Sequence, residues 1–173
     1  MARRRVPCGY KGKRKGNRFV IAFVLGVAIF CVITVCTNLG IRIVIVSGDS
    51  MEPTYHSGEL LIAIPPTYIG DDHPACWVKI GNENIIKRLV GYPGDVVELR
   101  DGDTYVNGVL LMERVGDYYD NMTFTLGDDQ YIFLGDNRGN SIDSRYWASP
   151  YVSSGQIMGV IVNSGWHGGD SDG

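Results

Sequence analysis

Residues 46–54, VSGDSMEPT, place a serine in a segment that can form an exposed loop. Ser50 follows Gly-Asp, and Pro53 restricts the chain shortly after it. Such a loop can present a hydroxyl nucleophile beside its own backbone N–H, the arrangement that acyl transfer needs. The same residue types are typical of turns, so a turn between two strands is the alternative for Ser50. This segment alone does not decide between the two interpretations.

A second segment, residues 84–95 (NIIKRLVGYPGD), contains a lysine within an apolar run that reads as a strand. Side chains alternate between the faces of a strand, so Lys87 and Arg88 are expected to point opposite ways. If Lys87 points inward, burial disfavours the charged ammonium and lowers its pKa toward the range useful for a general base. The alternative is an exposed edge-strand lysine, which hinders aggregation.

A third segment, residues 135–147 (GDNRGNSIDSRYW), is dense in polar residues and directly follows the apolar run 130–134. A calcium loop is excluded by spacing, because an EF-hand needs an acidic ligand at its twelfth position and flanking helices. A network of polar side chains that orients a neighbouring base fits this segment better than a calcium loop does. Hydroxyls and amides can hold a neutral amine by hydrogen bonds without restoring its charge.

Taken in this order after an apolar N-terminal run, the three segments resemble the bacterial type I signal peptidases, in their Gram-positive-like minimal form. The resemblance covers about residues 40–162. It implies a membrane-bound serine endopeptidase that removes N-terminal signal peptides from exported preproteins. Enzymes of this kind need no cofactor, so neither a cofactor nor a metal is expected.

The resemblance also implies a role for individual residues. Ser50 is the nucleophile, Lys87 its general base, and Ser141 the hydroxyl that orients Lys87, which together replace a Ser-His-Asp triad. The remaining residues shape the nucleophile loop against the substrate (Met51 and Pro53) or form ion pairs that brace the site (Arg88 with Asp136, and Asp143 with Arg145). The Ser50 backbone N–H is expected to hold the oxyanion. Gly48 stands where some relatives carry a serine as a second donor.

Residues 40–163 are predicted to form a mainly β, antiparallel catalytic domain. Short apolar runs alternate with Gly, Pro, Asn and Asp, and no long stretch has helical periodicity. Asn107-Gly108 between β-prone residues predicts a hairpin, because both residues tolerate positive φ. Strands are expected at 41–46, 59–64, 76–80, 84–90, 96–100, 104–112, 130–134 and 156–162.

The N-terminal region predicts a single transmembrane helix at 19–39. Residues 19–36 are 18 residues without a charge, close to the roughly 20 apolar residues that span a bilayer. A cleaved signal peptide is the alternative, but its apolar region is about 7–15 residues long and ends in small residues. Eight Lys and Arg residues within 1–18 place that segment in the cytoplasm and the domain outside it, by the positive-inside rule. Residues 164–173 are predicted to be a disordered tail.

The charge and the cysteines exclude several classes of protein. Residues 40–173 hold 8 basic and 19 acidic residues, a formal charge of −11, which argues against nucleic acid as a partner. Preproteins and the lipid bilayer are the expected partners. Cys76 is the one cysteine outside the N-terminal region, so neither an intrachain disulfide nor a zinc ribbon is predicted for the domain. Cys76 is expected to be buried and inert.

Three further interpretations of the sequence stand beside that of a general signal peptidase. A specialised peptidase with pilin-like or conjugation-related substrates shares the same chemistry, and the sequence does not separate it. A non-catalytic, membrane-tethered β-domain leaves Ser50, Lys87 and Ser141 unexplained. A histidine base is disfavoured, because His56, His73 and His167 fall outside the motifs and are expected on the surface.

Overall fold

The computed structural model describes residues 17–70, 72–114 and 118–162, and the chain divides into two units, 1–38 and 39–173. The first unit holds α1 (Asn17–Asn38). Its stretch Arg18–Asn38 is long and apolar enough to cross a membrane, judged by length and composition. Residues 19–38 of the expected spanning segment 19–39 therefore lie on a helix. Residues 1–16 of the predicted cytoplasmic segment 1–18 and the predicted tail 164–173 lie outside the described residues.

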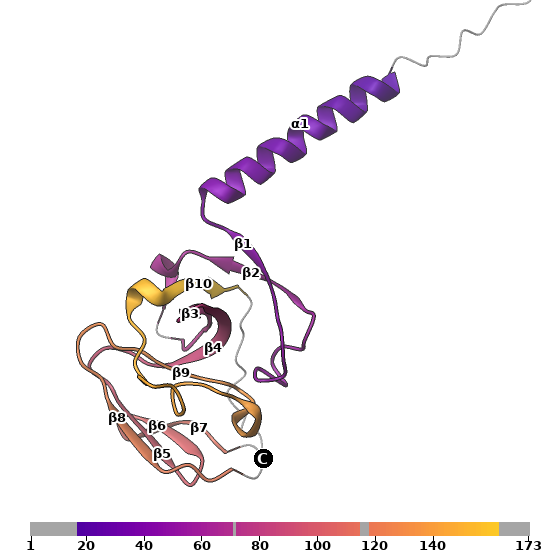
Figure 1. Cartoon of the computed structure of the whole chain (residues 1–173). Helices are drawn as coiled ribbons and strands as arrows, with labels where there is room; N and C mark the ends of the chain where they lie inside the picture. The colour runs from indigo at the N-terminus through magenta and orange to yellow at the C-terminus, as the bar shows by residue number, and fades with distance from the viewer. Residues whose placement is uncertain (1–16, 71, 115–117, 163–173) are drawn as a thin grey trace, which may run out of the picture. The chain divides into compact units, whose positions relative to one another are not determined.

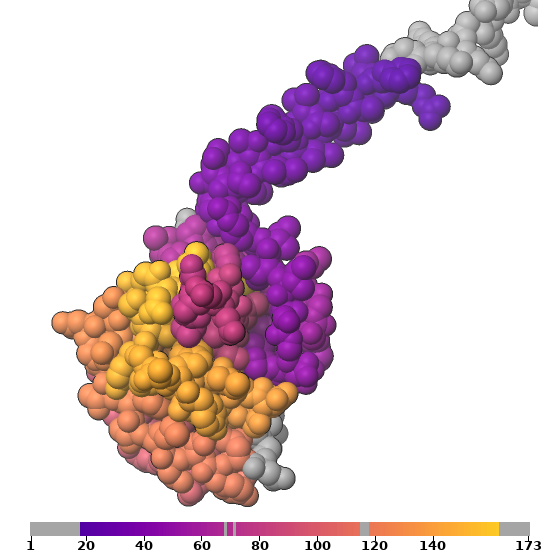
Figure 2. All heavy atoms as spheres, viewed as in Figure 1, coloured from indigo at the N-terminus to yellow at the C-terminus, as the bar shows by residue number. Residues whose placement is uncertain are grey.

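The second unit is built mainly from a six-stranded antiparallel sheet, sheet A, with the order β1-β2-β10-β3-β4-β9 (Figure 1). Figure 2 shows the yellow surface of β10 beside the magenta surface around residue 80, in agreement with the β10–β3 pairing. The strands of sheet A are β1 (Arg42–Ile45), β2 (Leu60–Ile64), β3 (Ala75–Ile80), β4 (Glu83–Gly91), β9 (Ile132–Leu134) and β10 (Ile157–Ile161).

A smaller antiparallel sheet, sheet B, has the order β7-β6-β5-β8. It contains β5 (Val96–Arg100), β6 (Asp103–Val106), β7 (Val109–Met112) and β8 (Met122–Thr125). Asn107 and Gly108 both have positive φ, +53° and +80°, in a two-residue loop between β6 and β7. The predicted hairpin is confirmed, and the expected strand 104–112 is two strands joined by that turn.

The mainly β, antiparallel prediction is confirmed, with differences at short elements. β8 was missed because its four residues, MTFT, are too short a run to stand out in the sequence, and its pairing with β5 defines it. The run expected from 130 begins as a strand only at Ile132, because Tyr131 forms an isolated bridge with Val152. Three short 3-10 helices were also missed, η1 (Pro66–Tyr68), η2 (Arg138–Asn140) and η3 (Ser154–Gln156).

The two sheets share an apolar cluster. Val90, Ile132 and Leu134 of sheet A pack with Val97, Leu99 and Phe124 of sheet B and with Leu126, which directly follows β8. Gly91 ends β4 at this junction, where an added Cβ atom would lie 2.5 Å from Val97 Cγ2 and 3.1 Å from Leu126 Cδ2. The junction has no room for a methyl group, so its packing fixes where β4 leaves sheet A.

Gly91→Ala is therefore expected to destabilise the second unit by about 1–3 kcal/mol, the usual cost of overpacking a filled core. Urea unfolding of the detergent-solubilised full chain, followed by tryptophan fluorescence, measures this cost. Gly155→Ala is the matched control, because no atom lies within 4 Å of its added Cβ. Equal unfolding midpoints for the two variants would contradict the tight junction.

Candidate active site

Ser50 lies on the loop between β1 and β2, and the residue after it anchors that loop in the core. Met51 is 1% exposed and packs with Val46 and Tyr55. The Tyr55 N–H donates to the Met51 carbonyl at 2.9 Å, which closes the turn behind Ser50. Pro53 is exposed. Met51 thus holds the loop by packing, while Ser50 itself is half-buried at the surface.

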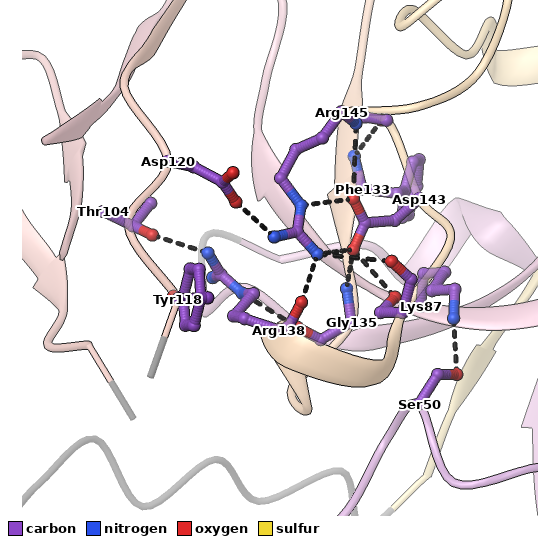
Figure 3. Close-up of polar contacts among 12 residues, drawn as sticks. Ser50, Lys87, Thr104, Tyr118, Asp120, Phe133, Gly135, Arg138, Asp143 and Arg145 are labelled. Carbon is purple, nitrogen blue, oxygen red and sulfur yellow. Dashed lines mark hydrogen bonds and ion pairs between the residues drawn. The ribbon is translucent and has the colours of Figure 1, made fainter. Parts of the chain in front are cut away.

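Lys87 donates a hydrogen bond from its Nζ to the Ser50 Oγ (Figure 3). It lies in the buried part of β4 and is only 4% exposed, so the interpretation as an exposed edge-strand lysine is wrong. Cys76 of β3 lies opposite Lys87 in the register, and Ala75 lies opposite Arg88. These small, fully buried partners leave space for the two long cationic side chains.

The surroundings of Lys87 favour its neutral form. Burial is the main cause and lowers the pKa of Lys87 below the usual lysine value; the negative charge of Asp143 opposes this shift, and the positive charge of Arg145 adds to it. No ion pair of Lys87 is found among the described residues. An amine of this kind can accept a proton from the hydroxyl that it contacts.

Arg88 and Asp136 form the first of the two predicted ion pairs, and it is bidentate. Arg88 Nε lies 2.7 Å from Asp136 Oδ1, and Arg88 Nη2 lies 2.8 Å from Asp136 Oδ2. Both side chains are almost fully buried, and a third nitrogen of Arg88 donates to the His73 carbonyl. The pair ties β4 to the loop that follows β9, because planar Arg–carboxylate pairs fix both distance and orientation.

Asp143 forms the second predicted ion pair, with Arg145, at 2.8 Å between Oδ1 and Nε. It also accepts hydrogen bonds from the Gly135 N–H at 2.9 Å and from the Ser141 hydroxyl at 2.8 Å. Burial alone would raise the pKa of Asp143, but the hydrogen bond and the charge of Arg145, together with the Gly135 and Ser141 donors, outweigh it and lower that pKa. Asp143 is therefore an ionised acceptor that organises this loop.

Ser141 is buried and donates to Asp143. Among the contacts of the described residues, no hydrogen bond joins it to Lys87, so its predicted orienting role stays a prediction. With its proton given to Asp143, the Ser141 oxygen retains acceptor capacity for the lysine. Gly135 lets the Ser141 side chain lie close to the nucleophile loop, because an added Cβ there would clash with Ser141 Oγ and lie 2.6 Å from the Ser50 carbonyl oxygen.

An open cleft of about 1050 Å³ runs over these groups. It brings together Ser50, Lys87 and Ser141, whereas Met51 and Pro53, predicted to face the substrate, do not line it. The lining comes from the nucleophile loop (Ser47, Gly48, Asp49, Ser50), from β3 and β4 (Ile80, Glu83, Ile85, Lys87) and from residues after β9 (Arg138, Gly139, Asn140, Ser141, Ile142, Tyr146, Trp147).

Sequence reasoning missed the contacts that attach the polar loop to sheet B and to the segment before β8. Arg138 is buried and donates to the Thr104 hydroxyl and to the Gly135 carbonyl, both at 2.8 Å (Figure 3). Arg145 pairs with Asp120 as well as with Asp143. The alternation of charges in residues 135–147 was a signal for such contacts, but their partners lie 25 and 34 residues away in the sequence.

The remaining candidate groups do not enter the cleft. His56 is exposed; His73 is half-buried, bonds the Leu89 carbonyl and packs against Tyr92, so the surface prediction is wrong for His73. His167 lies outside the described residues. Cys76 is fully buried, and burial raises its pKa to about 12, as expected for an inert thiol. In the described part of the chain, no cluster of three His, Cys, Asp or Glu residues suits a metal ion.

Comparison with known proteins places this geometry in a family context. The family described as "Signal peptidase, peptidase S26" matches residues 17–166. The "Probable signal peptidase I-2" of Synechocystis is 34% identical over 135 residues, which is 70% of this chain and 61% of that protein. The "Signal peptidase I" of Bacillus amyloliquefaciens is 35% identical over 117 residues, which is 58% of this chain and 63% of that protein. The chain thus spans about three fifths of the length of these curated relatives.

Among solved structures, the chain is similar to a signal peptidase I from Enterococcus faecalis. The sequence identity is 33%, the TM-score is 0.43, and the match covers 51% of this chain and 92% of that one.

Gly135→Ala is expected to remove activity while the fold persists, because the added methyl group would displace both Ser141 and the Ser50 carbonyl. We expect cleavage of a fluorogenic peptide to fall by about a hundredfold or more, as for loss of a positioned catalytic group. Gly155→Ala is again the control, and circular dichroism checks the fold. A Gly135→Ala enzyme with ordinary activity would show that this close approach has no functional role.

Proposed function

Because the chain belongs to the signal peptidase S26 family, we propose that it is a membrane-bound serine endopeptidase that cleaves signal peptides from exported preproteins. The observation that carries the proposal is the hydrogen bond between the buried Lys87 amine and the Ser50 hydroxyl at an open cleft. A nucleophile and a base within hydrogen-bond reach, with the base deprived of water, are what a Ser-Lys dyad requires.

In the first half of the reaction, the Ser50 oxygen attacks the scissile carbonyl carbon as its proton passes to Lys87. The carbonyl oxygen becomes an oxyanion, and the Ser50 backbone N–H donates to it. Collapse of this intermediate breaks the C–N bond, and Lys87 returns the proton to the departing amine. The mature protein leaves with a free N-terminus, and the signal peptide remains as an ester on Ser50.

In the second half, Lys87 is neutral again and takes a proton from water as that water attacks the ester. Collapse of the second tetrahedral intermediate breaks the bond to the Ser50 oxygen, which regains its proton from Lys87. The signal peptide leaves with a free carboxylate. Ser141 contributes an oxygen that accepts from the protonated lysine, while Asp143 keeps the Ser141 hydroxyl turned away.

The same proposal places α1 in a bilayer as a single-pass anchor. Its length and composition support this assignment. The eight basic residues within 1–18 favour a cytoplasmic N-terminus, which leaves the cleft on the far side of the membrane. Exported preproteins reach that side, so the proposed substrates and the proposed topology agree.

Ser50→Ala and Lys87→Met test the dyad in the detergent-solubilised protein with a labelled preprotein. Each is expected to lower cleavage by more than about a thousandfold, because members of such a unit act together. Lys79→Met is the matched control, since Lys79 is an exposed lysine of β3 and does not line the cleft. Substantial cleavage by Lys87→Met would remove the lysine from the mechanism, and no cleavage by the wild type would favour a non-catalytic domain.

The pH dependence provides a second test. A free lysine titrates near 10.4, so about one in 2500 is neutral at pH 7. Because burial lowers the pKa of Lys87, the neutral fraction and kcat/KM should rise with pH and level off below pH 10.4. Measuring kcat/KM of a peptide substrate against pH shows whether the general base titrates below the usual lysine value. An acidic limb that shifts in His73→Gln would instead assign the base to His73.

A further inference from the structure

We propose that Asn137 is a positioning residue that aims the oxyanion-binding N–H of Ser50; this inference rests on the proposed function. Asn137 is half-buried and begins the η2 turn. It does not line the cleft, so it reaches the reacting atoms only through the nucleophile loop. No motif in the sequence distinguishes it from the other polar residues of 135–147.

Asn137 contacts the peptide groups on both sides of the nucleophile. Its side-chain Nδ2 donates to the Asp49 carbonyl at 3.1 Å, and its backbone N–H donates to the Ser50 carbonyl at 3.0 Å. These carbonyls belong to the peptide units that precede and follow the Ser50 Cα. Both peptide groups that flank the Ser50 Cα are therefore held by one residue from a distant part of the chain.

The side-chain bond acts on the catalytic donor itself. The Asp49 carbonyl and the Ser50 N–H are the two ends of one planar peptide group, so fixing the carbonyl fixes the direction of the N–H. A hydrogen bond accepted by the carbonyl also polarises that group and strengthens its N–H as a donor. The Glu52 N–H donates to the same carbonyl at 3.2 Å, which completes its two acceptor positions.

Asn137 is itself held on a rigid support. Its neighbours on either side, Asp136 and Arg138, are buried and bonded to Arg88 and Thr104 respectively. The Asn137 carbonyl accepts from the Asn140 N–H at 3.0 Å. A residue fixed in this way can hold a neighbouring loop in register, whereas a mobile surface residue could not.

The experiment compares Asn137→Asp and Asn137→Ala with wild type, using Asn84→Asp as the matched control. Asn84 is an exposed asparagine of β4 outside the cleft. The carboxylate of Asn137→Asp keeps the side-chain shape but cannot donate to the Asp49 carbonyl. For each protein we would measure kcat and KM for a peptide, the thermal midpoint, and the affinity for the corresponding peptide aldehyde. Ser50 adds to the aldehyde carbon and gives its proton to Lys87, and the aldehyde oxygen becomes the oxyanion.

We expect kcat to fall about three- to tenfold in both Asn137 variants, the scale of one hydrogen bond. Aldehyde affinity should fall by the same factor, while KM changes by less than about twofold, because only the oxyanion loses stabilisation. Asn84→Asp should match wild type. A merely structural brace would instead lower the thermal midpoint or raise KM without a selective loss of aldehyde affinity.

Unchanged kcat and aldehyde affinity in both variants would overturn the inference, as would equal losses for aldehyde and ground-state peptide. If Asn137→Asp does not fold, Asn137→Ala carries the same comparison, since it retains the backbone bond to Ser50. Failure of Ser50→Ala to reduce cleavage refutes the proposed function separately. Absence of aldehyde binding to the wild type would overturn both.

Discussion

The contact between the Lys87 amine and the Ser50 hydroxyl requires a lysine that is both buried and neutral, and this requirement has a cost in stability. Because burial lowers its pKa, the folded protein binds fewer protons than the unfolded chain between the folded pKa of Lys87 and about 10.4. The contribution of Lys87 to stability therefore rises with pH across that window and is least favourable below it. A base that works near neutral pH thus weakens the fold that carries it, and other parts of the structure must offset the loss.

The ion pairs around the dyad serve geometry more than stability. Replacing a buried ion pair by apolar residues is often neutral or stabilising, so Arg88–Asp136 and Asp143–Arg145 are weak evidence for a more stable core. Their planar, bidentate contacts fix orientations instead, and the four bonds between guanidinium and carboxylate measure 2.7–2.9 Å. Each carboxylate is thereby paired with an arginine and not with Lys87. Lys87 then has a hydroxyl as its hydrogen-bond partner, which does not restore its charge as a carboxylate would.

The limits of sequence reasoning here follow from distance along the chain. The periodicity of residues 84–90 predicted a strand and put Lys87 and Arg88 on opposite faces, but it could not show that both faces are covered. The Asn107-Gly108 turn was predictable because its φ angles are a local property. Met51 was expected to face the substrate, yet its burial depends on Val46 and Tyr55. The contacts of Asn137 join the chain across 87 and 88 residues, and no local pattern encodes such pairing.

β4 positions both the general base, Lys87, and the support of the oxyanion donor. Lys87 faces the nucleophile from one side of the strand, while Arg88, the next residue, holds Asp136 from the other. Because side chains alternate, a slip of one residue in the β3–β4 register would exchange the two cations between faces. Ala75 and Cys76 oppose that slip, since their small side chains lie opposite the two long ones in the observed register. The base and the loop that supports the oxyanion donor are thus aligned by the pairing of a single strand.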